Sequence, residues 1–263
     1  MQYTFGFVGC GNMGGALVRA VAKTVDAKQI ALCDHNQDKA QALACDVGAV
    51  VTNAFDLVQN SRFIVLGMKP QAMQSSVQEF CDIVPKDSVI ITMAAGVSIQ
   101  KLRSFVGANV PVIRIMPNTP SQIGAGVILY DCDGVCKADE QTFLQAFAKA
   151  GVVDKLDENL IDAAACLSGC GPAFVYAFAQ ALAKGAVDLG VPQDKAETYA
   201  AHTLKGAAEM LLAYGDAESL KRAVCSPKGT TLAGLAHMEE HNFSTAVESG
   251  VKGAYKRTLE LQK

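Results

Sequence analysis

A glycine-rich segment near the N-terminus constrains the fold of this chain more than any other feature. Gly9, Gly11 and Gly14 form the pattern G-x-G-x-x-G directly after an apolar segment, Tyr3–Val8. In dinucleotide-binding folds the first glycine allows a tight turn and the second lets the backbone approach a pyrophosphate. The third glycine lets the following helix pack on the strand and point its N-terminal N–H groups at the phosphates. Asp34 ends the next apolar segment, where an acid often binds a ribose diol. The pattern therefore predicts a nicotinamide or flavin dinucleotide site.

Apolar, β-branched segments alternate with helical patterns as far as residue 155. We expect strands at residues 3–8, 30–33, 49–51, 63–67, 89–93, 112–116, 127–130 and 152–155. We expect helices at residues 16–25, 38–45, 73–81, 99–105 and 138–150. This alternation predicts an α/β fold with a doubly wound, mostly parallel sheet that is covered on both faces. The last two strands are expected to be edge strands that finish the sheet.

The composition changes beyond residue 158, where only alanine-rich helical patterns follow. We predict a Rossmann-type domain over residues 1–158 and an all-α domain over residues 159–263 that starts on a helix packed against the first domain. Residues 163–183 carry no charge, which is long enough for a membrane span, but glycines and a proline at residues 169–172 interrupt them. Because a helix that is apolar on all sides is normally buried, we expect this helix to be buried inside an oligomer.

Charge and the N-terminal sequence narrow the class of protein. The net charge is −3 and the pI is about 5.8, so no basic surface indicates nucleic acid or an anionic membrane as a partner. The sequence starts directly in the first expected strand, without the charged and apolar regions of a secretory signal. We therefore expect a cytoplasmic enzyme.

Two patterns resemble metal or redox sites without predicting one. Cys132/Cys136 and Cys166/Cys170 are each four residues apart among nine cysteines without a C-x-x-C pair. Small apolar residues in a reducing compartment account for them better than a metal. Residues 237–241 spell H-x-x-E-H, the inverted zinc-protease pattern, but stand at the polar end of an expected helix. We expect no metal.

Polar residues follow several expected strands at their carboxyl ends, the edge where doubly wound sheets bind ligands. Asn53 is placed to bond a ribose, and the backbone of Met68, Lys69 and Pro70 to line a cofactor. The Lys69 side chain either approaches a phosphate or lies in solvent. Asn118 offers donors and acceptors beside a nicotinamide.

Two clusters in the helical part are suited to an anion. Residues 167–173 combine two glycines with a proline, which predicts a kink or a fresh helix N-terminus. Residues 225–231 begin another helix, which Ser226, Thr230 or Thr231 is expected to cap. Hydroxyls and free N–H groups at one helix N-terminus favour a carboxylate.

Taken together, these segments resemble one family, Δ1-pyrroline-5-carboxylate reductase, over nearly the whole chain. The matching segments are Gly9-Cys10-Gly11-Asn12-Met13-Gly14, Met68-Lys69-Pro70, residues 94–97, residues 116–120, Asp162 with residues 167–173, and residues 226–231. The last two are the most specific, because other dinucleotide-binding enzymes lack them. The resemblance implies an oxidoreductase acting on an imine. It would transfer a hydride from NADPH or NADH to the C=N bond of 1-pyrroline-5-carboxylate and give L-proline, the last step of proline synthesis.

The resemblance also implies a set of functional residues and an assembly. Its cofactor contacts are Gly9, Cys10, Gly11, Asn12, Met13, Asn53, Met68, Lys69 and Pro70, to which the motifs above add Asp34 and Asn118. Its substrate contacts are Ser226, Gly229, Thr230 and Thr231, with the Thr231 hydroxyl near the ring nitrogen as the catalytic group. No histidine lies in these clusters, so catalysis would depend on orientation. The helical domain would interlock with a partner subunit in a homodimer or a higher homo-oligomer.

Two positions depart from the family pattern. Lys228 stands where the family more often has glycine, which restricts the backbone and adds a charge near an anion site. Asp34-His35-Asn36 replaces the serine- or asparagine-arginine pairing common in members that bind a 2′-phosphate. Asp34 favours NADH by charge, whereas the family usually favours NADPH and His35, Asn36 or Lys39 could accept the phosphate. The choice of cofactor stays open at this point.

Two other functions fit parts of the pattern. A reductase of the 6-phosphogluconate-dehydrogenase-like group would act on a hydroxy acid or ketoacid and would use a helix lysine, for which Lys184 is the only candidate. A dinucleotide-sensing protein would bind cofactor without turnover and would not need residues 226–231.

Overall fold

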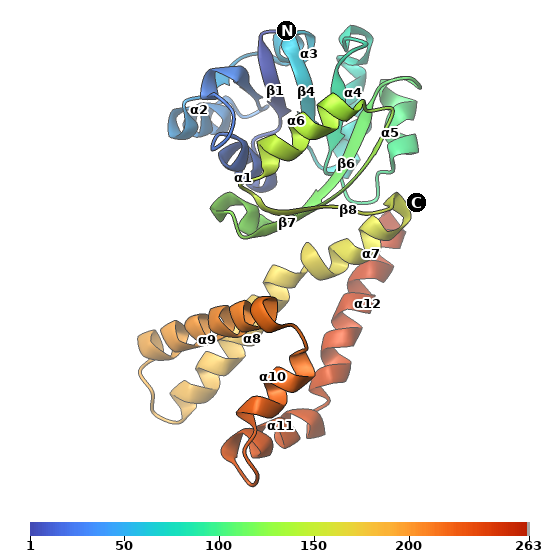
Figure 1. The fold of residues 1–263 in the computed structure, drawn as a ribbon. Helices are drawn as coiled ribbons and strands as arrows, with labels where there is room; N and C mark the ends of the chain where they lie inside the picture. The colour runs from blue at the N-terminus through green and yellow to red at the C-terminus, as the bar shows by residue number, and fades with distance from the viewer. Residues whose placement is uncertain (262–263) are drawn as a thin grey trace. The chain divides into compact units, whose positions relative to one another are not determined.

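An eight-stranded sheet forms the centre of the N-terminal part in the computed structural model, which describes residues 1–261 (Figure 1). Its strand order is β3-β2-β1-β4-β5-β6-β7-β8. The strands are β1 (Tyr3–Val8), β2 (Ile30–Cys33), β3 (Val50–Val51), β4 (Ser61–Leu66), β5 (Val89–Thr92), β6 (Val112–Pro117), β7 (Gly126–Asp133) and β8 (Gly151–Lys155). Strands β1 to β6 are parallel, β7 is antiparallel to β6, and β8 is parallel to β7.

The helices of this part connect successive strands, which is the predicted doubly wound arrangement. They are α1 (Asn12–Val21), α2 (Gln37–Val47), α3 (Ala54–Asn60), α4 (Pro70–Gln78), α5 (Ile99–Val106) and α6 (Lys137–Phe147). Three short 3₁₀ helices occupy Ala27–Gln29, Cys81–Ile83 and Thr119–Ile123. The eight predicted strands and five predicted helices are confirmed, and α3 was not predicted. The expectation that both final strands are edge strands is wrong for β7, because β7 pairs with β6 on one side and β8 on the other.

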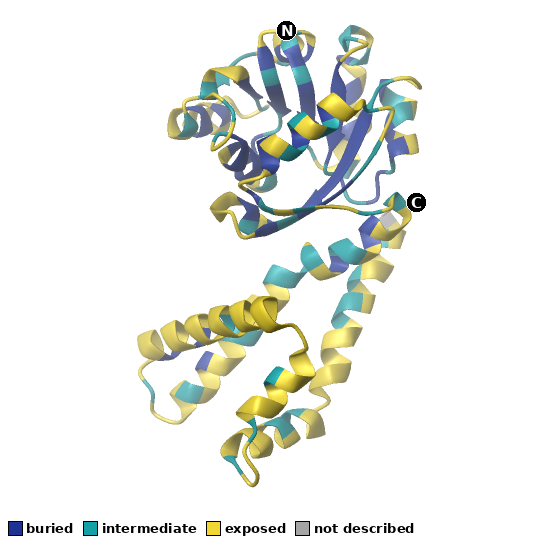
Figure 2. Cartoon of the chain, viewed as in Figure 1, coloured by how far each residue is buried: buried dark blue, intermediate teal, exposed yellow. Residues whose placement is uncertain are grey.

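Both faces of the sheet are covered, and alternation along the strands assigns each side chain to one face. Along β4, Phe63 and Val65 belong to the core under α1, α2 and α6, whereas Ile64 and Leu66 belong to the core under α3, α4 and α5. The strands and the inner faces of these helices are accordingly the buried part of the chain (Figure 2). A strand buried on both faces needs a nearly continuous apolar sequence, which is why these strands were recognisable.

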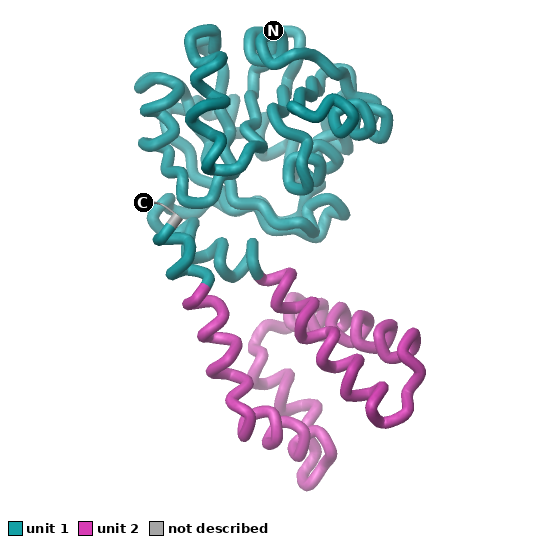
Figure 3. Tube along the Cα trace, turned by 180° about the vertical axis from the view of Figure 1, so that it is seen from behind, with its two compact units in different colours: residues 1–170, 254–263 teal, residues 171–253 magenta. Residues whose placement is uncertain are grey.

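By contact, the chain divides into two compact units (Figure 3). Unit 1 comprises Met1–Cys170 and the end of α12 from Ala254 onward, and unit 2 comprises Gly171–Gly253. Helix α7 (Glu158–Ser168) belongs to unit 1 because it packs on β6 and β7, as expected for the first helix beyond residue 158. The contact-based division falls between Cys170 and Gly171. The predicted domain boundary at residue 158 stays a prediction.

Unit 2 is entirely helical, and no strand occurs between residues 159 and 261, as predicted. Its helices are α8 (Gly171–Asp188), α9 (Gln193–Tyr214), α10 (Ala217–Val224), α11 (Thr230–Glu240) and the first part of α12 (Phe243–Leu261). Helices α8 and α9 pack together through Ala183, Ala196 and Ala200, which are the buried residues of this unit within the described part of the chain.

The apolar segment Glu158–Asp188 is long and apolar enough to span a membrane, and its most apolar window is only 11% buried. The predicted interruption is present, since α7 ends at Ser168 and α8 begins at Gly171. The core helices of soluble proteins can have the same length and apolar composition. The expected burial of this helix is therefore not achieved within one chain, and its burial inside an oligomer stays a prediction.

Candidate active site

The glycine-rich loop joins β1 to α1 at the carboxyl edge of the sheet. Gly9 has a positive φ of 107°, and a Cβ at this position would lie 2.8 Å from the carbonyl carbon of Gly67. A Cβ at Gly14 would collide with the carbonyl oxygen of Gly9. Both glycines are therefore required by contacts within the protein, as the first and third positions of the motif predict.

Gly11 is different because no protein contact requires a glycine there. A Cβ at Gly11 would have no atom within 4 Å, and its φ of −66° is accessible to every residue. Gly11 is also the N-cap of α1, which has no side-chain cap and no acid in its first turn. The open space and the free N–H groups of Asn12 and Met13 fit a pyrophosphate group, which the backbone approaches at this glycine.

Gly11→Ala should leave the fold intact and weaken cofactor binding. The new methyl group fills the space that fits the pyrophosphate, and we expect dinucleotide affinity to fall by about tenfold or more. The free energy of unfolding should change by less than about 1 kcal/mol, because the φ of this position suits alanine. Titration calorimetry and urea unfolding measure the two quantities. The matched control Gly14→Ala should instead lower stability clearly, and unchanged affinity in Gly11→Ala would remove Gly11 from the site.

The Asp34 carboxylate attaches the glycine-rich loop to the end of β2. Its Oδ2 accepts a hydrogen bond from the Cys10 N–H (2.7 Å) and its Oδ1 accepts one from the Asn36 N–H (2.8 Å). The side chain is only 5% exposed. Burial, together with the Asp34 charge, raises the pKa of the Cys10 thiol to about 12, so this thiol is neutral and is no nucleophile. A ribose contact of Asp34 stays a prediction.

A cavity of about 470 Å³ opens beside Asp34, where β2 and β3 end. Helix α2 contributes Gln37, Asp38 and Gln41 to its lining, and the connection from β3 to α3 contributes residues 52–54. Sequence reasoning missed the three α2 residues. Their spacing of three to four residues on one helix face was the signal that could have found them.

Asn53 lines this cavity and is also the N-cap of α3. Its Oδ1 accepts the Asp56 N–H (2.9 Å), and its Nδ2 donates to the Asp56 carboxylate (2.6 Å). The predicted ribose contact would thus come from a side chain that already has local partners.

Met68, Lys69 and Pro70 lie next to the glycine-rich loop, because β4 is paired with β1. The Gly67 N–H donates to the Val8 carbonyl oxygen (2.8 Å), which joins the ends of the two strands. Lys69 is the N-cap of α4 without a side-chain cap, and Pro70 occupies the first helical turn. The structure thus brings these residues, Asp34, Asn53 and residues 9–13 together at one edge of unit 1.

The Asn118 side chain has a structural role at the end of β6. It is 6% exposed; its Nδ2 donates to the Ser168 carbonyl oxygen (3.0 Å) and its Oδ1 accepts the Val127 N–H (2.9 Å). These bonds join β6, β7 and the end of α7. A contact between Asn118 and the nicotinamide stays a prediction.

The predicted substrate residues lie together in unit 2, at the start of α11. The expectation that a hydroxyl of Ser226, Thr230 or Thr231 caps this helix is wrong: the N-cap is Gly229, and no side chain caps it. A Cβ on Gly229 would collide with the Ser226 hydroxyl. The backbone carbonyl oxygen of Ser226 accepts a hydrogen bond from the Gly229 N–H (2.9 Å). The first N–H groups of α11 are left open, and its first turn contains no acid. This arrangement suits a carboxylate.

Lys228 has a φ of 59°, in the left-handed region that glycine adopts at least cost. The preference of the family for glycine at this position thus has a backbone reason. The lysine is exposed and makes the turn that leads into α11.

The remaining candidates make local contacts. Lys184 forms an exposed ion pair with Asp188 on α8 (2.8 Å). The His237 Nδ1 lies 3.1 Å from a Glu240 carboxylate oxygen, and the His241 Nδ1 lies 2.8 Å from the His237 carbonyl oxygen. Across residues 1–261, no three His, Cys, Asp or Glu side chains are grouped to hold a metal ion.

The open, doubly wound sheet and the glycine-rich, uncapped start of α1 define unit 1 as a dinucleotide-binding domain. A family model described as NADP oxidoreductase, coenzyme F420-dependent, matches residues 4–96. A second model, described as pyrroline-5-carboxylate reductase dimerisation, matches residues 158–261.

Relatives cover the chain from end to end. Pyrroline-5-carboxylate reductase 3 of Danio rerio is 35% identical over 99% of this chain and 92% of its own length. The pyrroline-5-carboxylate reductase of Escherichia coli (strain K12) is 32% identical over 100% of both chains. The structure of Plasmodium falciparum pyrroline carboxylate reductase with NADP bound has a TM-score of 0.90, at 25% identity and full coverage of both chains. The chain belongs to the pyrroline-5-carboxylate reductase family, which confirms the resemblance and the predicted fold class.

Proposed function

We propose that the chain reduces 1-pyrroline-5-carboxylate to L-proline with a hydride from bound NAD(P)H, as the final step of proline biosynthesis. Family membership supports the reaction, and the geometry at the start of α11 supports a substrate that has a carboxylate group. This helix begins at a glycine, without a capping side chain or an acid, inside the segment most specific to the family. A free helix N-terminus of this kind attracts the carboxylate of a small substrate.

In the proposed cofactor site the backbone does most of the binding. The N–H groups of Gly11, Asn12 and Met13 hold the pyrophosphate, with Gly9 and Cys10 shaping the loop. Met68, Lys69 and Pro70 line the nicotinamide side, Asn53 and Asp34 the ribose side, and Asn118 lies at the end of β6. When bound, the nicotinamide supplies the hydride, and the protein positions the two reactants.

In the proposed substrate site the N–H groups at the start of α11 bind the carboxylate, together with the hydroxyls of Ser226 and Thr230 and the backbone of Gly229. Thr231, in the first turn of α11, places its hydroxyl at the ring nitrogen. When the imine nitrogen is protonated, the C=N carbon is already electrophilic, so the enzyme requires no separate general acid. The Thr231 hydroxyl stabilises the nitrogen as its positive charge disappears during hydride addition.

The direct test is the initial rate of NADH and NADPH oxidation by the full-length protein with 1-pyrroline-5-carboxylate, with proline measured as product. The proposal expects one proline for each cofactor oxidised. Cofactor binding without oxidation would overturn the reductase assignment and favour the ketoacid reductase or the sensor.

Thr231→Ala should lower kcat by at least about tenfold, since a hydrogen bond aimed at a developing charge change contributes several kcal/mol to catalysis. Its stability should change by less than about 0.5 kcal/mol, because Thr231 is exposed in the chain. Thr231→Ser keeps the hydroxyl and should restore most of the rate. Steady-state kinetics and urea unfolding measure both effects. Lys184→Ala serves as the contrasting variant: it should be nearly as active as the wild type, whereas a lost activity would indicate the lysine-dependent ketoacid reductase.

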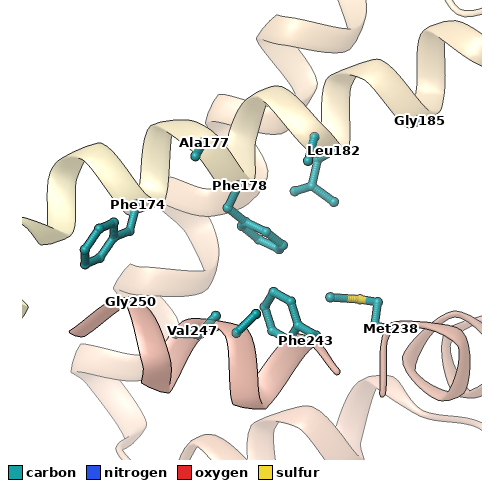
Figure 4. Close-up of a pocket in the computed structure, with 11 residues that line it drawn as sticks. Phe174, Ala177, Phe178, Leu182, Gly185, Met238, Phe243, Val247 and Gly250 are labelled. Carbon is teal, nitrogen blue, oxygen red and sulfur yellow. The ribbon is translucent and has the colours of Figure 1, made fainter. Parts of the chain in front are cut away.

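We also propose that the chain works as a homodimer, in which a second copy covers the apolar faces of unit 2. A groove of about 580 Å³ runs between α8 and the segment from α11 to α12. Its lining is entirely apolar, and side chains such as Phe174, Phe178 and Leu182 of α8 face Met238 and Phe243 across it (Figure 4). The match of residues 158–261 to a dimerisation model supports a copy of this chain as the occupant.

A cytoplasmic location and the domain limits 1–158 and 159–263 complete the proposal. All nine cysteines are free thiols, which is typical of proteins in a reducing compartment. The dimerisation model starts at residue 158, which supports the second limit.

A further inference from the structure

The charged residues that line the cavity beside Asp34 are all negative. Asp34 and Asp38 are the charged residues of its lining, and the other polar residues there are Gln37, Gln41, Thr52 and Asn53. No lysine, arginine or histidine of the described residues 1–261 lines it. The cavity therefore presents two carboxylates and no compensating cation to whatever enters it.

Its place in the fold indicates what enters. The cavity lies beside the carboxyl ends of β2 and β3, next to the strand that carries the glycine-rich loop. In doubly wound dinucleotide domains an acid at the end of the second strand faces the adenosine ribose. The 2′ position of that ribose carries a hydroxyl in NADH and a phosphate, with a charge of roughly −1.5 to −2, in NADPH.

Asp34 cannot easily move aside for a phosphate. Its two oxygens accept the N–H groups of Cys10 and Asn36 at 2.7 and 2.8 Å, and its side chain is almost fully buried. A rotation away from the cavity would break both bonds and leave two N–H groups without an acceptor. The charge of Asp34 is therefore held in place by the same contacts that hold the loop.

The basic residues nearby, His35 and Lys39, do not line the cavity. The His35 ring is 93% exposed and its Nδ1 lies 3.1 Å from the Asp34 Oδ1, so it faces solvent beside the carboxylate. Lys39 is exposed, and its backbone N–H donates a hydrogen bond to the Asn36 Oδ1 (3.2 Å). Asp38, in the first turn of α2, opposes the attraction that this helix N-terminus would exert on a phosphate.

We infer that this chain selects NADH over NADPH, and that Asp34 and Asp38 are the residues that determine this selection. The inference rests on the proposed binding of NAD(P)H in unit 1. A ribose 2′-hydroxyl donates to the Asp34 carboxylate, whereas a 2′-phosphate meets the fixed charge of Asp34 and the exposed carboxylate of Asp38. The chain would thus differ from the Plasmodium falciparum relative, whose structure holds NADP.

Titration calorimetry of the full-length protein with NAD⁺ and NADP⁺ tests the selection without any substrate. We expect NAD⁺ to bind at least about tenfold more tightly, and the difference to shrink as salt is added. Asp38→Asn should tighten NADP⁺ binding by roughly threefold and leave NAD⁺ binding nearly unchanged. Asp34→Asn, which keeps an acceptor oxygen for the Cys10 N–H, should reduce the ratio further. The matched control is Glu79→Gln, an exposed acid at the C-cap of α4, which should not change the ratio.

Equal or tighter binding of NADP⁺ would overturn the inference, as would a ratio that Asp38→Asn leaves unchanged. Failure of the proposed function is a separate result, because it appears as missing proline formation while the two binding constants still differ. Absence of binding by both dinucleotides would overturn the proposed function and this inference together.

Discussion

Replacing Ala181 by glutamate is expected to convert the proposed homodimer into a monomer whose helical unit does not fold. Ala181 is exposed on α8 and lines the apolar groove of unit 2. A carboxylate placed there would be buried without a partner when a second copy covers the groove, which costs several kcal/mol. Within one chain, the buried residues of this unit are only Ala183, Ala196 and Ala200 among those described, so the core of a single copy is small.

Sedimentation velocity and far-ultraviolet circular dichroism measure this outcome. The variant should sediment as a monomer, lose helical signal and show no reductase activity. Ala138→Glu is the matched control, since this exposed alanine lies on α6 of unit 1, and it should retain the mass and spectrum of the wild type. A monomeric Ala181→Glu variant with full helical content would contradict the dependence of unit 2 on a partner.

Asp162→Ala is expected to destabilise unit 1 by about 3 to 5 kcal/mol. The Arg114 guanidinium is 2% exposed, and its two terminal nitrogens contact Asp162 (2.5 Å) and Glu158 (3.4 Å). These ion pairs attach α7 to the middle of β6. Removing Asp162 leaves a buried cation with only the longer contact, so the loss is dominated by the desolvated charge that remains.

Urea unfolding at one fixed protein concentration measures the effect. The double variant Arg114→Met/Asp162→Leu removes both charges and should recover most of the lost stability, because apolar residues of similar size often replace a buried pair without cost. Asp188→Ala, which breaks the exposed pair with Lys184, should change stability by less than about 1 kcal/mol. A loss of that small size in Asp162→Ala would show that α7 is attached by its apolar contacts instead.

The sheet could be predicted because burial on both faces imposes an apolar, β-branched sequence on each strand. Helix α3 was missed since it has seven residues and buries only Leu57 and Val58, which is too little for a helical period. The reversal of β7 was also invisible, because side-chain pattern does not specify strand direction. The uncharged stretch of α8 predicted a helix buried inside an oligomer, yet one chain leaves this helix mostly exposed, so its burial stays a prediction.

For the site, short sequence motifs could be recognised, but contacts between residues far apart in the chain could not be predicted. The roles of the motif glycines could be assigned from their spacing, although the contact of Gly9 with Gly67 could not. In contrast, the Asp34 contact with the Cys10 N–H depends on the pairing of β1 with β2. The Arg114 pairing with Asp162 spans 48 residues. The predicted cap of α11 was wrong for a steric reason, since the turn at Lys228 puts Gly229, which has no side chain, at the capping position.

The small core of unit 2 has a consequence for how the protein is made. The two large cores of unit 1 lie within residues 1–170 and can form while the ribosome still synthesises the rest, whereas in the proposed homodimer unit 2 would complete its burial only when a second chain arrives. Recovery of activity after dilution from denaturant should therefore become a second-order process at low protein concentration. Co-translational encounter of neighbouring nascent chains would shorten this wait. Expression level would then limit how much enzyme matures, independently of how well each chain is translated.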